Sequence, residues 1–186
     1  VFAVVIGKEA FGGTGMNVFN PALLARAFIF FAYPAQMTGD KIWTAGLTKA
    51  TEVADGFSGA TPLSYAAANA TDKLPSLQDL FFGFIPGSIG ETSKLAILIG
   101  AAILIITGIG SWRIILSGVL GGTIMTLIFN AFALNEYMKI DPLTQLMMGS
   151  FLFGIVFMAT DPVTPAQTNK GKWIYGFLAG FFAIMV

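Results

Sequence analysis

The sequence I-I-L-S-G-V-L-G-G-T-I-M-T-L-I-F-N-A-F-A-L-N, residues 114 to 135, decides the fold of this chain, because it is an uncharged apolar run between Arg113 and Glu136. A helix needs about 20 such residues to cross a bilayer. Runs of similar character occupy residues 95 to 112 and 142 to 160. The pattern predicts three membrane-crossing helices.

The composition supports the same fold class. Hydrophobic residues make up 55% of the chain and charged residues only 11%, whereas about a quarter of the residues of a soluble domain are charged. We therefore predict an all-α polytopic membrane protein, a transmembrane helical bundle in which Gly118, Gly121 and Gly122 let helices approach closely. Its helices are expected at about residues 94–111, 113–134, 142–160 and 173–186, the last cut off by the end of the chain.

The N-terminal part predicts a further helix over about residues 19–37, interrupted by Arg26, and residues 1–6 have the character of another helix end. The chain has no initiating Met and begins and ends in apolar sequence. We expect it to be a fragment of a longer protein with no signal peptide visible. The expected regions are residues 1–37, a polar loop over 38–93, and the helices of 94–186.

The loop of residues 38–93 is the longest polar stretch, and Pro62, Pro75 and Pro86 exclude a long helix within it. It is the region expected to form a surface domain. Residues 80–85 are an apolar patch too short to span a bilayer, and we expect them to lie on the membrane interface.

Two segments interrupt the helical pattern. Residues 11–22 read F-G-G-T-G-M-N-V-F-N-P-A, in which Pro21 is placed to begin a helix, and residues 158–166 read M-A-T-D-P-V-T-P-A. Broken helices in matching places are typical of internally repeated transporter-like folds. This suggests broken helices related by an internal inverted repeat; the alternative is that both segments are loop edges.

Basic residues give an orientation. If the helices alternate, the short connections on one side carry Lys8, Arg113, Lys170 and Lys172. The long loop and the connection at 135–141 then lie on the other side. The positive-inside rule predicts that the first side is cytoplasmic and that the long loop faces the periplasm.

The chain contains no Cys and no His, which excludes disulfides, thiolate-held iron–sulfur clusters, axial haem histidines and ordinary zinc sites from these residues. If electrons pass through the fragment, an organic cofactor must carry them, and a flavin fits. The formal net charge is zero and the basic residues are spread along the loops, so nothing indicates nucleic-acid binding. The expected partners are lipid, other membrane subunits and small ligands.

The sequence D-G-F-S-G-A-T at residues 55–61 places a hydroxyl next to residues with almost no side chain. An enzyme or a phosphate group can reach such a hydroxyl, so Thr61 is a candidate for a modified residue. Ordinary turn chemistry also accounts for the Asp, Ser and Gly of this loop.

Two charged residues next to apolar helices are further candidates. Arg26 has no acidic residue four positions before or after it, so it either extends to the interface or binds a flavin phosphate. Asp161 precedes Pro162 and either caps a short following helix or contributes to a sodium path. In the second case the hydroxyls of Thr160 and Thr164 would add oxygen ligands.

Three motifs together carry a family resemblance. They are G-K-E-A-F-G-G-T-G-M-N-V-F-N-P-A-L-L-A-R-A-F-I-F-F-A-Y-P-A-Q-M at 7–37, D-G-F-S-G-A-T at 55–61 and A-T-D-P-V-T-P-A at 159–166. The second matches D-x-x-(S/T)-G-A-T, which looks like the acceptor motif at which a flavin transferase attaches FMN, through its phosphate, to the threonine hydroxyl. The chain resembles the C-terminal half of the NqrB subunit of sodium-translocating NADH:quinone oxidoreductases, in the NqrB/RnfD family.

The resemblance implies a bacterial inner-membrane subunit that carries FMN on Thr61 by a phosphoester bond and contributes to riboflavin and ubiquinone sites. Electrons from NADH would arrive through partner subunits and leave to quinone while sodium is driven outward. The residues expected around the flavin are Asp55, Ser58, Gly59, Ala60 and Arg26, and Asp161 is expected on the sodium path.

Three alternatives remain open at this point. A homologous RnfD-like subunit shares the acceptor motif but couples ferredoxin and NAD. Related folds also conduct small neutral solutes, which makes a passive channel the alternative from another class. The third is a structural membrane subunit without a cofactor.

Overall fold

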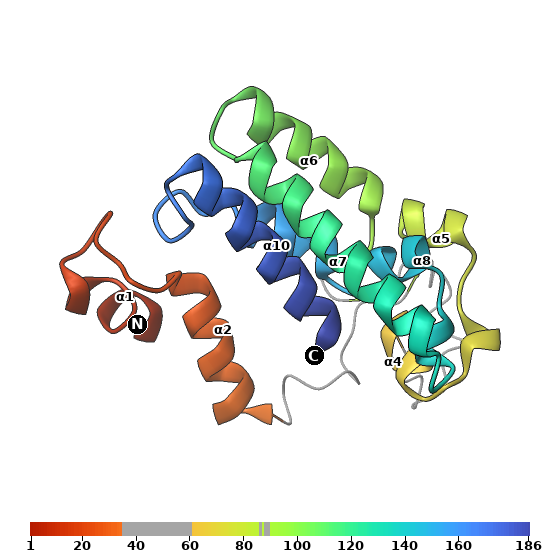
Figure 1. The fold of residues 1–186 in the computed structure, drawn as a ribbon. Helices are drawn as coiled ribbons and strands as arrows, with labels where there is room; N and C mark the ends of the chain where they lie inside the picture. Colours follow the sequence, from red (N-terminus) through yellow and green to blue (C-terminus); the bar gives the residue numbers. More distant parts are fainter. Residues whose placement is uncertain (35–60, 86, 88–89) are drawn as a thin grey trace.

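The computed structural model describes residues 1–34, 61–85, 87 and 90–186 (Figure 1), and the elements of regular structure in this part of the chain are helices. They are α1 (Phe2–Val5), η1 (Glu9–Phe11), α2 (Pro21–Ala32), α4 (Pro62–Ala67), η3 (Thr71–Lys73), α5 (Leu77–Phe82), α6 (Lys94–Ile106), α7 (Trp112–Phe132), η4 (Tyr137–Lys139), α8 (Pro142–Met147), α9 (Phe151–Phe153), η5 (Gly154–Met158) and α10 (Asn169–Met185).

The longest helix, α7, lies where the decisive apolar run predicts it. Within the described residues it is the one helix long and apolar enough to cross a membrane alone, while α2 and α6 are apolar but shorter. It ends at Ala133, whose φ of 45° is left-handed and whose N–H donates to the carbonyl of Phe129. This sharp end turns the chain back toward η4.

Helices α7 and α10 run side by side in the same direction (Figure 1). Near their starts the rings of Trp112 and Trp173 lie 6.0 Å apart. Further along, a Cβ built on Gly121 would lie 2.1 Å from the carbonyl oxygen of Phe177. The glycines of α7 therefore bring the two backbones into contact, as predicted, since no larger residue fits there.

The apolar run at residues 142–160 is divided, and the prediction of one helix there is wrong. Helix α8 stops at Met147, Met148 is extended with ψ of 150°, and Gly149 has φ of 57°. The helix resumes at Phe151 and continues as the π-helix η5. A left-handed φ favours glycine over other residues, so Gly149 is the residue that permits the break.

The described part of the polar loop folds into the short elements α4, η3 and α5. Leu80 and Ile85 are buried there with Ala66, Ile140 and Met148 in one core cluster. Leu80 and Ile85 thus pack against the α8 end of the bundle, whereas Phe82 and Phe84 of the same segment are exposed. The position of residues 80–85 on the membrane interface stays a prediction. Leu80 and Ala66 are the most deeply buried residues of this cluster, each with 0% of its surface exposed.

Local capping sets two other helix starts. Pro21 begins α2 as predicted, and the side chain of Asn20 accepts hydrogen bonds from the N–H groups of Ala22 and Leu23. At the other end of the chain, α10 starts at Asn169, four residues before the start that the sequence suggested. The Thr168 hydroxyl accepts from the N–H of Gly171 and caps this earlier turn.

Candidate functional site

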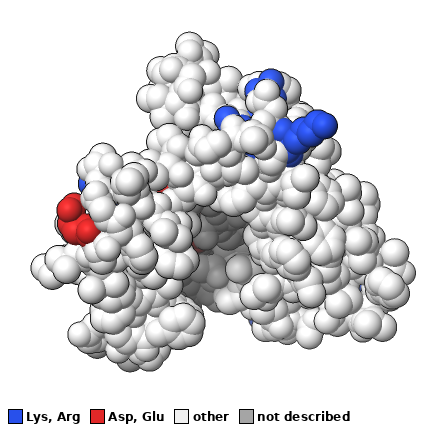
Figure 2. Space-filling model, turned by 60° about the vertical axis from the view of Figure 1, so that its left-hand side comes forward, with Lys and Arg blue, Asp and Glu red and all other residues white. Residues whose placement is uncertain are grey.

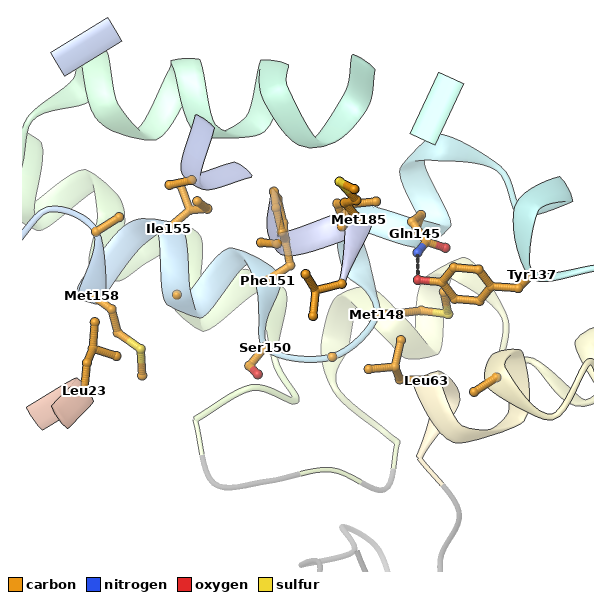
Figure 3. A pocket seen from close by; sticks show the side chains of 18 of the residues that line it. Leu23, Leu63, Tyr137, Gln145, Met148, Ser150, Phe151, Ile155, Met158 and Met185 are labelled. Atoms are coloured by element: carbon orange, nitrogen blue, oxygen red, sulfur yellow. Dashed lines mark hydrogen bonds between the residues drawn. The ribbon is translucent and has the colours of Figure 1, made fainter. Parts of the chain in front are cut away.

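A cavity of about 790 Å³ lies beside the divided helix. Most of its lining is apolar, and Figure 3 shows side chains from α2, α4, α8, η5 and the end of α10 around it. Among them are Leu23, Leu63, Phe151, Ile155 and Met158. Its volume is in the range of roughly 300–1,000 Å³ that is typical of small-molecule sites, so it is the first candidate for a ligand site.

The helix break beside the cavity is held by a buried cation. The side chain of Lys94 is 1% exposed, and its ammonium group donates to the backbone carbonyls of Glu91 and Gly149, the latter at 3.1 Å. The Gly149 carbonyl belongs to the segment where helical hydrogen bonding is interrupted. Lys94 thus supplies a donor that the broken helix lacks.

A polar pair stands on the wall of this apolar cavity (Figure 3). The Gln145 side-chain N–H donates to the Tyr137 hydroxyl at 2.5 Å. Gln145 is 3% exposed, and its Oε1 has no hydrogen-bond partner within the described residues. The Tyr137 hydroxyl accepts this bond and keeps its own hydrogen, so it can donate to a molecule in the cavity.

Thr61, the candidate attachment residue, caps α4. Its Oγ1 accepts from the N–H of Ser64 at 3.2 Å, and its carbonyl accepts from the Ser64 hydroxyl at 2.8 Å. Two residues further on, Leu63 lines the cavity, and a Cβ on Gly149 would contact the Leu63 side chain at 3.4 Å. The helix that Thr61 begins therefore packs against the break.

Of the other members of the predicted flavin site, only Arg26 lies within the described residues. Asp55, Ser58, Gly59 and Ala60 lie outside the described residues. Arg26 is exposed on α2 and is not among the residues that line the cavity, although Leu23, one turn before it, is.

Asp161 lies in an irregular connection between η5 and α10. Its carboxylate accepts from the Thr164 hydroxyl at 2.6 Å and from the N–H of Val163 at 3.5 Å. No helix starts there, so the expected capping role is wrong: these are the bonds of a local turn. The Thr160 hydroxyl instead donates to the Val156 carbonyl at 2.6 Å, and no cluster of three potential metal-binding side chains occurs in the part of the chain that is described.

Comparison of the sequence with known proteins identifies the family of the chain. The profile of the family described as NQR2, RnfD, RnfE matches residues 1–186. The chain belongs to the NQR2, RnfD, RnfE family. Membership identifies it as part of a membrane protein, in agreement with its composition and with the apolar helix α7.

Individual members of the NQR2, RnfD, RnfE family align with every residue of the chain. The B subunit of the Na(+)-translocating NADH-quinone reductase of Chromohalobacter salexigens is 50% identical over 190 residues, which are 44% of its length. The B subunits of the same name from Pseudomonas aeruginosa strain LESB58 and Yersinia pestis are 48% and 50% identical, each over 45% of their length. The chain thus spans less than half the length of these relatives, and its resemblance to the NqrB subunit is confirmed.

Three residues of the cavity region were not singled out from the sequence. Tyr137 and Gln145 lie in and after the connection that follows α7, and no motif marks them. Lys94 carries a weak signal, since it stands directly before the uncharged run of 95–112. A lysine at the edge of an apolar run usually extends to water, and only the three-dimensional structure places this one against Gly149.

Proposed function

We propose that this chain is part of the membrane subunit of a sodium-pumping NADH:ubiquinone oxidoreductase, in which FMN bound covalently to Thr61 passes electrons toward ubiquinone while sodium is exported. The observation that carries the proposal is 50% identity over the whole chain to a protein named as the B subunit of a Na(+)-translocating NADH-quinone reductase. Partner subunits would deliver electrons from NADH.

The environment of Thr61 fits a phosphoester link. Its Oγ1 accepts one hydrogen bond from Ser64 N–H and retains its own proton. Attachment by a transferase would form the Thr61 Oγ–P bond and break the phosphoanhydride bond of a flavin dinucleotide donor. The hydroxyl proton would pass to a base of the transferase, and the other mononucleotide would leave. We expect Asp55, Ser58, Gly59 and Ala60 to serve as the recognition motif for the transferase. When bound, FMN supplies the electron-transfer chemistry that the protein side chains cannot supply.

The cavity next to α4 supports a role in holding redox molecules. Its lining is largely apolar, with Tyr137 and Gln145 as polar groups, which suits the ring systems of a flavin or a quinone. We propose that it contributes to the riboflavin or ubiquinone site of the subunit. Arg26 is proposed to contact a flavin phosphate contributed by the Thr61 loop.

The sodium path is proposed to pass Asp161. Its carboxylate and the Thr164 hydroxyl, 2.6 Å apart, are hard oxygen groups of the kind that alkali and alkaline-earth cations bind. Residues 11–22 and 158–166 are proposed to be related by an inverted repeat. Residues 1–37, 38–93 and 94–186 are proposed to be the three domains of the chain.

The proposed orientation of the chain in the membrane rests on the N-terminal ends of α7 and α10, which lie side by side. Trp112 and Trp173 are in contact, which places Arg113, Lys170 and Lys172 at one end of α7 and α10. By the positive-inside rule this end is cytoplasmic, in the inner membrane of a bacterium. The Thr61 loop then faces the periplasm.

In-gel fluorescence tests the proposal. The full-length subunit, produced together with a flavin transferase and denatured on a gel, is expected to fluoresce under ultraviolet light, while Thr61→Ala is dark. Thr71→Ala, a threonine change outside the acceptor motif, should remain fluorescent. A wild-type protein that stays dark in the presence of the transferase, and whose Thr61 peptide has its unmodified mass, overturns the assignment.

A further inference from the structure

The N-terminal ends of α7 and α10 form a surface whose character changes along the helices. Basic residues come first, aromatic residues lie beside them, and apolar residues follow. Figure 2 shows a group of Lys and Arg side chains at the top of the molecule. Arg113, Lys170 and Lys172 belong to the first turns of these two helices, and neither first turn contains an acidic residue. One ion pair in the described part of the chain, Lys139 with Glu136, is at the opposite end of α7.

Two indole rings fix the depth of this surface relative to a bilayer. Trp112 and Trp173 meet edge to face at 6.0 Å and are 45% and 37% exposed. The guanidinium carbon of Arg113 lies 4.9 Å from the centre of the Trp112 ring. Exposed tryptophans concentrate at the headgroup level of membranes, because their rings are apolar and their N–H groups are polar. The basic residues therefore lie at the level of lipid phosphates.

An apolar track leads away from the indoles along α7. Trp112, Leu116, Leu120 and Ile124 are all exposed and recur every four residues, so they share one face of the helix. From the first to the last, the track rises about 18 Å at 1.5 Å per residue. This is close to half of the roughly 30 Å hydrocarbon thickness of a bilayer, which is the depth that one acyl chain reaches.

From this succession we propose that the starts of α7 and α10 bind an anionic phospholipid. Its phosphate would lie among Arg113, Lys170 and Lys172, and an acyl chain would follow the track from Trp112 to Ile124. Charge favours an anionic headgroup over a zwitterionic one, because three cations here have no ion-pair partner in the described residues. The inference does not depend on the flavin and stands if the proposed function fails.

Native mass spectrometry of the full-length subunit tests this site. After delipidation in mild detergent, dioleoyl phosphatidylglycerol is expected to remain bound under conditions that remove dioleoyl phosphatidylcholine. The combined variant Arg113→Gln, Lys170→Gln, Lys172→Gln should bind phosphatidylglycerol on the order of 100-fold more weakly. Lys139→Gln, a basic residue at the other end of α7, is the control and should bind like the wild type.

A second variant keeps the proposal testable if the basic variant does not fold. Leu116→Ser with Leu120→Ser interrupts the track and should weaken binding of the long-chain lipid while leaving the basic residues in place. Equal retention of the two lipids, or unchanged binding by both variants, overturns the proposal. Displacement of the lipid by inorganic phosphate would indicate a site for free anions instead. Protection of Lys170 from an amine reagent in the delipidated complex would indicate that a partner subunit covers this surface. Either result overturns the proposed lipid site.

Discussion

Gly180 of α10 lies directly against the backbone of Gly118 in α7: a Cβ built on Gly180 would lie 1.8 Å from the Gly118 carbonyl oxygen. The neighbouring Gly176 is similarly placed, 2.1 Å from the Ser117 hydroxyl by the same measure. Two parallel helices joined in this way form a rigid pair. The divided helix between them in sequence, and the cavity beside it, are positioned by this pair.

Replacing Gly180 with alanine should destabilise the protein, because the obstructing atom is backbone and cannot rotate away. We expect a loss of about 1–3 kcal/mol or more in the free energy of unfolding. Thermal unfolding of the detergent-solubilised full-length subunit measures it. The matched control is Gly154→Ala, because a Cβ at Gly154 meets nothing within 4 Å and alanine favours the helix. Equal losses of stability in the two variants would show that the close contact at Gly180 does not matter.

The buried ammonium of Lys94 gives a second prediction. Lys94→Met keeps the length of the side chain but leaves the carbonyls of Glu91 and Gly149 without this donor. The cost should be about 1–3 kcal/mol of stability, the usual penalty for an unsatisfied buried polar group. Lys139→Met is the control, since Lys139 is exposed and an exposed ion pair contributes little. Equal melting temperatures of the Lys94 variant and the wild type would show that the break does not depend on this bond.

The helix break shows where prediction from the sequence stops. Helix α7 could be predicted because the uncharged apolar run of residues 114–135 is as long as a helix that crosses a bilayer. The residues Met148, Gly149 and Ser150 include no proline and no charge, so hydropathy alone does not distinguish a break there from a continuous helix. What decides it is the φ of 57° at Gly149 together with the distant Lys94, and neither is local to the run.

The Thr61 region shows a different limit. The sequence T-P at residues 61–62 followed by Ser64 is a recognisable helix start, with a capping hydroxyl and Pro at the first position. Its packing against Gly149 depends on tertiary structure. The cavity was likewise not predictable, because Tyr137, Gln145 and Leu63 come from three separate elements.

The Tyr137–Gln145 pair predicts non-additive substitutions. Tyr137→Phe leaves the Gln145 N–H without its partner in a site where Oε1 already lacks one, and should cost about 1–3 kcal/mol. Adding Gln145→Leu removes both unsatisfied groups and should restore much of this loss. A double-mutant cycle from chemical denaturation measures the coupling. Additive single effects would indicate that the hydrogen bond contributes nothing.

Thr61→Asn separates the capping role of this residue from its proposed role as flavin acceptor. Asparagine caps helices as well as threonine does, so α4 and the stability of the protein should be preserved. The amide cannot form the phosphoester, and in-gel flavin fluorescence should be lost. Thr61→Ser retains both the cap and the hydroxyl and is expected to fluoresce if the transferase accepts serine. Fluorescence of the Asn variant would show that the flavin is attached elsewhere.

Asp161→Asn tests the sodium path without disturbing the local turn. The Val163 N–H and the Thr164 hydroxyl bond to different carboxylate oxygens of Asp161. In the amide, the oxygen can still accept from the Val163 N–H and the NH2 group can donate to the Thr164 hydroxyl oxygen, while the negative charge is removed. If a sodium ion passes this carboxylate, the sodium concentration for half-maximal quinone reduction by the assembled complex should rise on the order of tenfold. Asp141→Asn is the matched control, because the Asp141 carboxylate likewise accepts two local hydrogen bonds, in its case from the backbone N–H groups of Leu143 and Thr144 at the start of α8. An unchanged sodium dependence in a folded Asp161 variant, or an equal shift in both variants, would remove Asp161 from the path.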